Sequence, residues 1–138
     1  AIAARTRAAG ARWLVSGELD RIADWPADGV HLSTRQLVES HRRPVAADRL
    51  LAASCHDLEE IRMAADLEAD FVTLAPVSAT QRHPGLSPLG WHDFERVVRH
   101  SPLPVLALGG LEPDDWGHAR AAGAFGVAGV RAFGWSEA

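Results

Sequence analysis

Six short runs of apolar residues recur along the 138-residue chain, and their spacing restricts the fold more than any other feature. The runs are rich in Val, Leu and Ala, and Gly, Pro or polar residues bound each one. Continuous apolar runs of this kind are typical of parallel strands that are buried on both faces. We therefore predict strands at residues 12–17, 29–33, 50–55, 71–76, 104–109 and 126–130.

Longer stretches with helical periodicity separate several of these runs. Residues 56–69 carry an apolar face, and Asp57 near their start is a favourable N-cap. Residues 90–100 stop before two prolines, and residues 112–124 place a proline in their first turn and a glycine near their end. Strands that alternate with helices at this spacing predict a parallel sheet wound by right-handed crossovers.

Two similar tags, ADGV at 27–30 and AFGVAGV at 124–130, each follow a helical stretch and enter a strand. Such repetition is typical of a (β/α)8 barrel, whose units are alike and whose ligand-binding groups lie on the loops after the strands. A closed barrel has more strands than the chain supplies. We predict an α/β fold, a partial TIM (β/α)8 barrel with six βα units present, the first two strands missing, and residues 1–10 left from the second helix. A complete open α/β sheet is the alternative.

Composition excludes several classes of protein. The formal net charge is −4 and the arginines are scattered among carboxylates, so no nucleic-acid partner is expected. The apolar runs are too short to span a membrane and the start lacks a signal-peptide core, so we expect no membrane partner and a cytoplasmic location. The single cysteine, Cys55, fits a reducing compartment. The chain has no lysine, so phosphate contacts must come from Arg, His, hydroxyl or backbone N–H groups.

Five motifs occur in the chain in this order: ADGVHLSTRQL, SCHDLEE, ADFVTLAPVSATQRHPGLSPLG, PVLALGGL and GVAGVRAF. Together they resemble the thiamine phosphate synthase and TenI family of (β/α)8 barrels. The resemblance implies that residues 1–138 are a single, N-terminally incomplete domain of this kind. It also implies the family's reaction, which joins hydroxymethylpyrimidine diphosphate to thiazole phosphate with Mg²⁺ and releases pyrophosphate, giving thiamine phosphate.

The resemblance and the physics of barrels place a phosphate site after the later strands. Backbone N–H groups at Gly109 and Gly110 are expected to approach a phosphate, although a tight turn also explains this pair. Val130 ends the last predicted strand and Arg131 follows it, and both are expected to contact the phosphate. Arg131 stands where the family has a small serine. Its guanidinium can bind a phosphate or fill the pocket. Ser54 corresponds to a serine that contacts diphosphate in the family, and a role at the helix entry is the alternative.

The loop that begins at Pro76 is expected to cover the ligand. The family has Thr-x-Thr-Lys where this chain has TQRH at 80–83. We expect Thr80 and His83 to be the catalytic residues, and Thr80 and Arg82 to contact phosphate, although Arg82 can equally be a solvated loop residue. Pro76 is expected to line the pocket. It stands where the tautomerase branch of the family has its catalytic histidine, so tautomerase activity is not expected.

The two acidic positions that bind Mg²⁺ in the family have lost their carboxylates. Ser16 and Gly17 stand at the family's Asn-Asp pair, and Gln36 stands at the second acidic position. Glu18 can replace the lost aspartate, or it can be a solvated residue that starts the next helix. Because Mg²⁺ prefers anionic oxygen ligands, we expect no metal site, no cofactor and impaired synthase chemistry, and Mg²⁺ is implied by the resemblance only.

Three histidines, His31, His56 and His83, are expected near the barrel mouth because they stand at strand ends. Their spacing does not form a zinc-binding pattern. His31 is expected to be a pocket residue with a structural role, hydrogen-bonded under the mouth. A nucleophile formed by Cys55 and His56 is not expected, because neighbours at a strand end diverge.

Three functions stay open at this point. The first is a domain that binds a small phosphorylated heterocycle without synthase chemistry, and the second is an active thiamine phosphate synthase. The third is a non-catalytic C-terminal domain of a Nudix hydrolase fusion of the 8-oxo-dGTP diphosphatase kind, since AASCHD, LAPV, HPG, LGW and ALGGL are similar to the synthase-like domain in some bacterial fusions. A Nudix domain in the parent chain and a homo-oligomer formed through an exposed sheet edge are the further expected partners.

Overall fold

The computed structural model of the chain describes residues 2–80 and 84–131. Within them, six strands form one parallel sheet in the order β1-β2-β3-β4-β5-β6. All six predicted strands are confirmed, and most are shorter than expected. Their bounds are β1 Leu14–Val15, β2 Gly29–Leu32, β3 Leu50–Cys55, β4 Phe71–Leu74, β5 Val105–Leu108 and β6 Gly126–Ala128.

The helices begin at local signals in the sequence. Their bounds are α1 Ile2–Ala8, α2 Leu19–Ile22, α3 Thr34–Glu39, α4 Leu58–Asp66, α5 Gly90–Arg99, the 3-10 turn η1 Pro113–Asp115 and α6 Trp116–Ala121. The Asp57 carboxylate accepts the backbone N–H of Glu60 at 2.8 Å, which confirms the expected N-cap of α4. The sequence analysis did not predict α3. A capping box formed by Ser33 and Gln36 starts this helix, and its pattern is readable in the letters STRQ.

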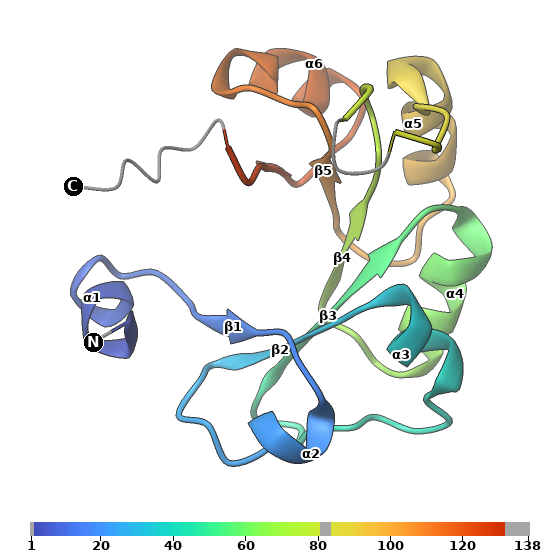
Figure 1. Cartoon of the computed structure of the whole chain (residues 1–138). Helices are drawn as coiled ribbons and strands as arrows, with labels where there is room; N and C mark the ends of the chain where they lie inside the picture. Colours follow the sequence, from blue (N-terminus) through green and yellow to red (C-terminus); the bar gives the residue numbers. More distant parts are fainter. Residues whose placement is uncertain (1, 81–83, 132–138) are drawn as a thin grey trace.

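The strands form a curved half-barrel, with α3, α4, α5 and α6 on its outer side (Figure 1). Each strand pairs in parallel with the strand that follows it in sequence. A doubly wound open sheet requires a point where the strand order reverses, and this sequential order has none. The alternative of such an open sheet is therefore excluded, and the half-barrel expected from the repeated strand–helix units is confirmed.

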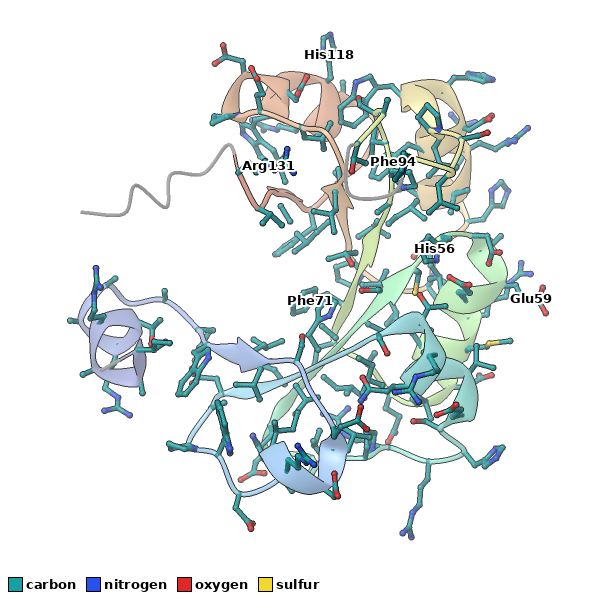
Figure 2. All side chains as sticks on the ribbon, in the orientation of Figure 1. His56, Glu59, Phe71, Phe94, His118 and Arg131 are labelled. Carbon is teal, nitrogen blue, oxygen red and sulfur yellow. The ribbon has the colours of Figure 1, made fainter. Side chains whose placement is uncertain are left out.

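The hydrophobic core lies between the sheet and the outer helices. Leu51, Ile61 and Phe94 are fully buried there, and Phe94 meets Trp91 edge to face with ring centroids 5.5 Å apart. Burying a side chain such as Phe94 stabilises the fold by about 2–3 kcal/mol. Figure 2 shows Phe94 beside α5 and Phe71 on the opposite, open side of the sheet. Side chains alternate along each strand, so this core leaves the inner face to a different set of residues.

The loop after β4 packs directly against the turn after β5. Val77 N–H donates to the Leu108 carbonyl and Ser78 N–H donates to the Gly109 carbonyl, each at 3.0 Å. Gly109 has a φ of +106°, and a Cβ atom there would lie 2.7 Å from Pro76 Cα. Only glycine fits this close approach of two backbones. The tight turn that the sequence analysis weighed for this glycine is therefore present, whether or not the turn also binds phosphate.

Replacing Gly109 tests this packing. We expect Gly109→Ala to lower the free energy of unfolding by about 2–4 kcal/mol, because Cβ collides with the Pro76 backbone and φ is unfavourable. Gly117→Ala is the control. Nothing lies within 4 Å of a Cβ at this position in α6, so the change should be neutral or stabilise by about 0.5–1 kcal/mol. Urea unfolding of both variants measures the difference, and equal stabilities would contradict the close approach.

Candidate functional site

A cleft of about 760 Å³ opens at the carboxyl ends of the strands. Parallel strands bring all their carboxyl ends to one edge, so the loops that follow them meet there. The volume is within the range of small-molecule sites. The lining residues are Ser16, Ser33, Thr34, Ser54, Cys55, His56, Thr73, Ala75, Pro76, Ala79, Thr80, Leu86, Leu108, Gly109, Gly110, Leu111, Glu112, Gly129, Val130 and Arg131.

Most of the residues expected to bind phosphate, together with the expected pocket residue Pro76, line this cleft. They come from the ends of four strands and the loops after them: Ser54, Pro76, Thr80, Gly109, Gly110, Val130 and Arg131. Arg82 and His83 lie outside the described residues, so their expected roles stay predictions. The structure thus brings together residues that are up to 77 positions apart in the sequence, from Ser54 to Arg131. Their shared position supports a ligand site, and their individual roles are not assigned by it.

His31 lies on β2 below the cleft and is not among the residues that line it. Its register partner on β3 is Ala52, so the ring is on the same face of the sheet as the cleft floor. Its backbone carbonyl accepts the Ser16 hydroxyl at 3.2 Å, which links the ends of β1 and β2. Burial lowers the pKa of His31 below its ordinary value of 6.5, because desolvation disfavours the charged ring.

The lowered pKa of His31 makes folding stability depend on pH. Below about pH 6.5 the unfolded chain takes up a proton at His31 that the folded chain resists, so stability should fall as the pH decreases. The contribution of neutral His31 to the free energy of unfolding is complete above this pH and is lost as the pH falls below it. Urea unfolding between pH 5 and 7.5 should show a shallower loss for His31→Gln. His92→Gln, on the exposed surface of α5, serves as the control and should keep the wild-type slope. Parallel slopes for all three proteins would contradict the assignment.

The two positions that the resemblance assigns to Mg²⁺ binding are joined by a hydrogen bond. Gln36 donates from its side-chain amide to the Gly17 carbonyl at 2.8 Å, and its side-chain oxygen accepts the Ser33 N–H at 3.0 Å. Glu18 precedes α2 as its N-cap residue, and its carboxylate pairs with Arg35 at 3.3 Å on the surface. The reading of Glu18 as a solvated residue at the start of the next helix is therefore supported.

These residues do not fit Mg²⁺. The ion requires several hard, preferably anionic oxygen ligands. Here the two available carbonyl oxygens, of Gly17 and Gln36, already accept hydrogen bonds, and neither position carries a charge. Among residues 2–80 and 84–131, no three His, Cys, Asp or Glu side chains are grouped so that they could hold a metal ion.

Three hydroxyl-bearing residues in the cleft, Ser33, Thr34 and Thr73, were missed by the sequence analysis. All three lie within the family motifs, but nothing in those motifs distinguishes them as cleft residues. Thr73 is buried, and its hydroxyl oxygen has no hydrogen-bond partner among the described residues. A buried hydroxyl without a partner costs folding free energy, so its retention at a cleft is compatible with a role toward a polar ligand.

His56 is oriented by two side chains. Its Nδ1 lies 3.1 Å from Glu60 Oε2 and 3.3 Å from Thr34 Oγ1. The neighbouring Cys55 is buried, and burial followed by the nearby Glu60 and Asp57 charges raises the pKa of its thiol to about 12. A neutral, buried thiol is a poor nucleophile, which agrees with the expectation that cysteine catalysis is absent.

The half-barrel and the cleft at its carboxyl edge define a (β/α)-barrel domain with a polar cleft of small-molecule size. Comparison with known sequences then identifies which barrel it is. Residues 1–133 match the TMP-TENI family model, which is described as thiamine monophosphate synthase. The chain therefore belongs to the thiamine monophosphate synthase and TenI family, and the resemblance found in its motifs is confirmed.

Individual relatives agree with this family. A thiamine-phosphate synthase of Thermosynechococcus vestitus is 34% identical over 89% of this chain and 35% of its own length. One of Chloroflexus aurantiacus is 30% identical over 92% of this chain and 59% of its own length. The solved thiamine phosphate pyrophosphorylase of Pyrococcus furiosus superimposes with a TM-score of 0.72 at 26% identity, covering 91% of this chain and 59% of that one. The chain thus spans about a third to three fifths of these relatives.

More distant structures show the fold alone. A structure described as native KDPGal has a TM-score of 0.67 at 18% identity and covers 92% of this chain. In the part of the chain that the structure describes, no helix has the length and apolar character needed to cross a membrane.

Proposed function

We propose that this domain binds a phosphorylated thiazole or thiamine phosphate in the cleft, with impaired synthase chemistry. Membership of the family supports the class of ligand. The cleft offers hydroxyls from Ser54 and Thr80, the Gly109–Gly110 turn and the Arg131 guanidinium as phosphate contacts. Neutral donors of this kind, together with one guanidinium, bind phosphate without a metal ion. By the family pattern, Arg82 and His83 would contribute from the loop over the ligand.

The observation that carries the proposal is the hydrogen bond between Gln36 and Gly17. These residues stand at the two acidic positions of the family, and here one donates to the other at 2.8 Å. The side-chain oxygen of the same amide accepts the Ser33 N–H in the capping box of α3. Gln36 in this way links the first turn of α3 to the loop after β1. This structural role supports the proposal that the cleft has lost its site for a metal-bound diphosphate.

A calorimetric titration of the full-length protein tests the proposal. We expect thiazole phosphate or thiamine phosphate to bind with a Kd on the order of micromolar, and added Mg²⁺ to leave the Kd unchanged. Incubation with both synthase substrates and Mg²⁺ should yield no thiamine phosphate. Tighter binding with Mg²⁺ together with product formation would show an active synthase. An absence of binding to both compounds would overturn the proposed ligand.

Two variants of Ser54 link the binding to the cleft. Ser54→Leu places a bulky side chain in the cleft lining and should weaken binding by at least about tenfold, because the ligand and the new side chain compete for the same space. Ser54→Ala keeps the space and should retain most of the affinity. Equal affinity of wild type and Ser54→Leu would place the ligand elsewhere.

Gln36→Glu tests the link between the former metal positions. The carboxylate cannot donate to the Gly17 carbonyl, so we expect a loss of about 1 kcal/mol in the free energy of unfolding. Because the variant restores an anionic ligand, Mg²⁺ should recover part of this loss. Gln36→Leu is the control, and it should be destabilised without any response to Mg²⁺. Thermal unfolding with and without Mg²⁺ measures both effects. A Gln36→Glu variant as stable as wild type without Mg²⁺ would contradict the structural role.

A further inference from the structure

His56 lies at the carboxyl end of β3, immediately before the N-cap of α4 (Figure 2). It is one of the residues that line the cleft. The sequence analysis placed it near the mouth and gave it no role. Its side chain is 41% exposed, so one part of the ring is open to solvent in the cleft and the other part contacts neighbouring side chains.

The hydrogen bonds around the ring determine where its proton lies. Thr34 donates its single hydroxyl proton to the Ser54 carbonyl at 2.9 Å, so its oxygen can only accept from His56. Glu60 also accepts, and its Oε2 already receives the His56 backbone N–H at 2.6 Å. Both neighbours of Nδ1 are therefore acceptors. Nδ1 carries a proton, and Glu60 and Thr34 hold the ring in one orientation.

Nε2 is the remaining functional atom of this ring. No hydrogen bond joins it to any residue in the described ranges 2–80 and 84–131. With Nδ1 protonated, Nε2 accepts a hydrogen bond when the ring is neutral and donates one when the ring is cationic. A ring with a fixed orientation and one uncommitted nitrogen beside a cleft is suited to contact a ligand.

The charges of the cleft indicate which ligand group this nitrogen meets. Among the described lining residues, Arg131 and His56 are the groups that can carry positive charge, and Glu112 is the sole carboxylate. The former metal positions supply no cation site, as the bond between Gln36 and Gly17 shows. An anionic phosphate in the cleft would therefore favour the cationic form of the imidazole.

Charged groups lie on both helices that pack around the ring. Glu60 on α4 lies against Nδ1, and Asp57 at the N-cap of the same helix adds a second carboxylate nearby. Arg35 follows Thr34 on α3, but its guanidinium pairs with Glu18 at 3.3 Å and with Glu39 at 3.8 Å. The Arg35 guanidinium is thus engaged by other carboxylates, and Glu60 is the charged side chain that contacts the ring.

We propose that His56, held by Glu60 and Thr34, donates a hydrogen bond from Nε2 to the phosphate of the ligand. This inference rests on the proposed function, because it assumes that a phosphorylated ligand occupies the cleft. His56 is the contacting residue, and Glu60 is a positioning residue that acts through it. The imidazolium then contributes a positive charge on the side of the cleft formed by β3.

Two substitutions of His56 by amide side chains test the roles of the two ring nitrogens separately. In His56→Asn, the amide nitrogen stands near the place of Nδ1, so the contact with Glu60 can persist while the Nε2 donor is lost. In His56→Gln, the longer side chain places its amide nitrogen near Nε2. We expect His56→Asn to weaken the binding of thiazole phosphate by about tenfold or more, and His56→Gln to remain within about threefold of wild type. Calorimetry on the full-length protein measures both.

The unphosphorylated thiazole alcohol is the control ligand matched to thiazole phosphate. Its affinity should be the same in wild type and His56→Asn, because it lacks the phosphate. Glu60→Gln should weaken the binding of thiazole phosphate and not that of the alcohol. If wild type binds thiazole phosphate and His56→Asn binds it equally well, the role of His56 is overturned while the proposed function stands. If wild type binds neither thiazole phosphate nor thiamine phosphate, the proposed function fails and this inference fails with it.

Discussion

Each strand of this chain hydrogen-bonds in parallel to the strand that follows it in sequence, and this ladder decides where the functional side chains lie. The register pairs Ser54 with Thr73 and Cys55 with Leu74 on neighbouring strands. Residues two positions apart therefore share a face across the sheet. One face packs against the outer helices, and the other forms the floor beneath the cleft. A shift of one residue in any pair would exchange these two faces.

The cleft is held together by hydrogen bonds between loops. Gln36 joins the first turn of α3 to the loop after β1, Thr34 joins the start of α3 to the end of β3, and the backbone after β4 joins the turn after β5. Each bond crosses from one βα unit to the next. Side chains that serve as links in this way are not available to bind a metal ion, so the same contacts that order the loops also shape the chemistry of the site.

The sequence analysis predicted the strands and the longer helices because their signals are local. Apolar runs, the Asp57 N-cap and the prolines after residue 100 all act within a few residues, and the structure confirms the elements they predict. The strand ends were less predictable, because residues such as Pro76 and Val130 continue an apolar run and still leave the ladder to line the cleft. The capping box at Ser33 and Gln36 was readable, but its letters were interpreted only through the family motif.

The sequence by itself determined the family, the parallel strand–helix architecture and some of the residues that line the cleft. These follow from short-range patterns and from motifs in a fixed order. Tertiary structure alone decided that Gln36 holds Gly17, that the thiol of Cys55 is buried, and that Glu60 and Thr34 orient His56. The physical reason is that a side chain's partners and its desolvation depend on which distant segments pack against it, and one-dimensional spacing does not specify these contacts.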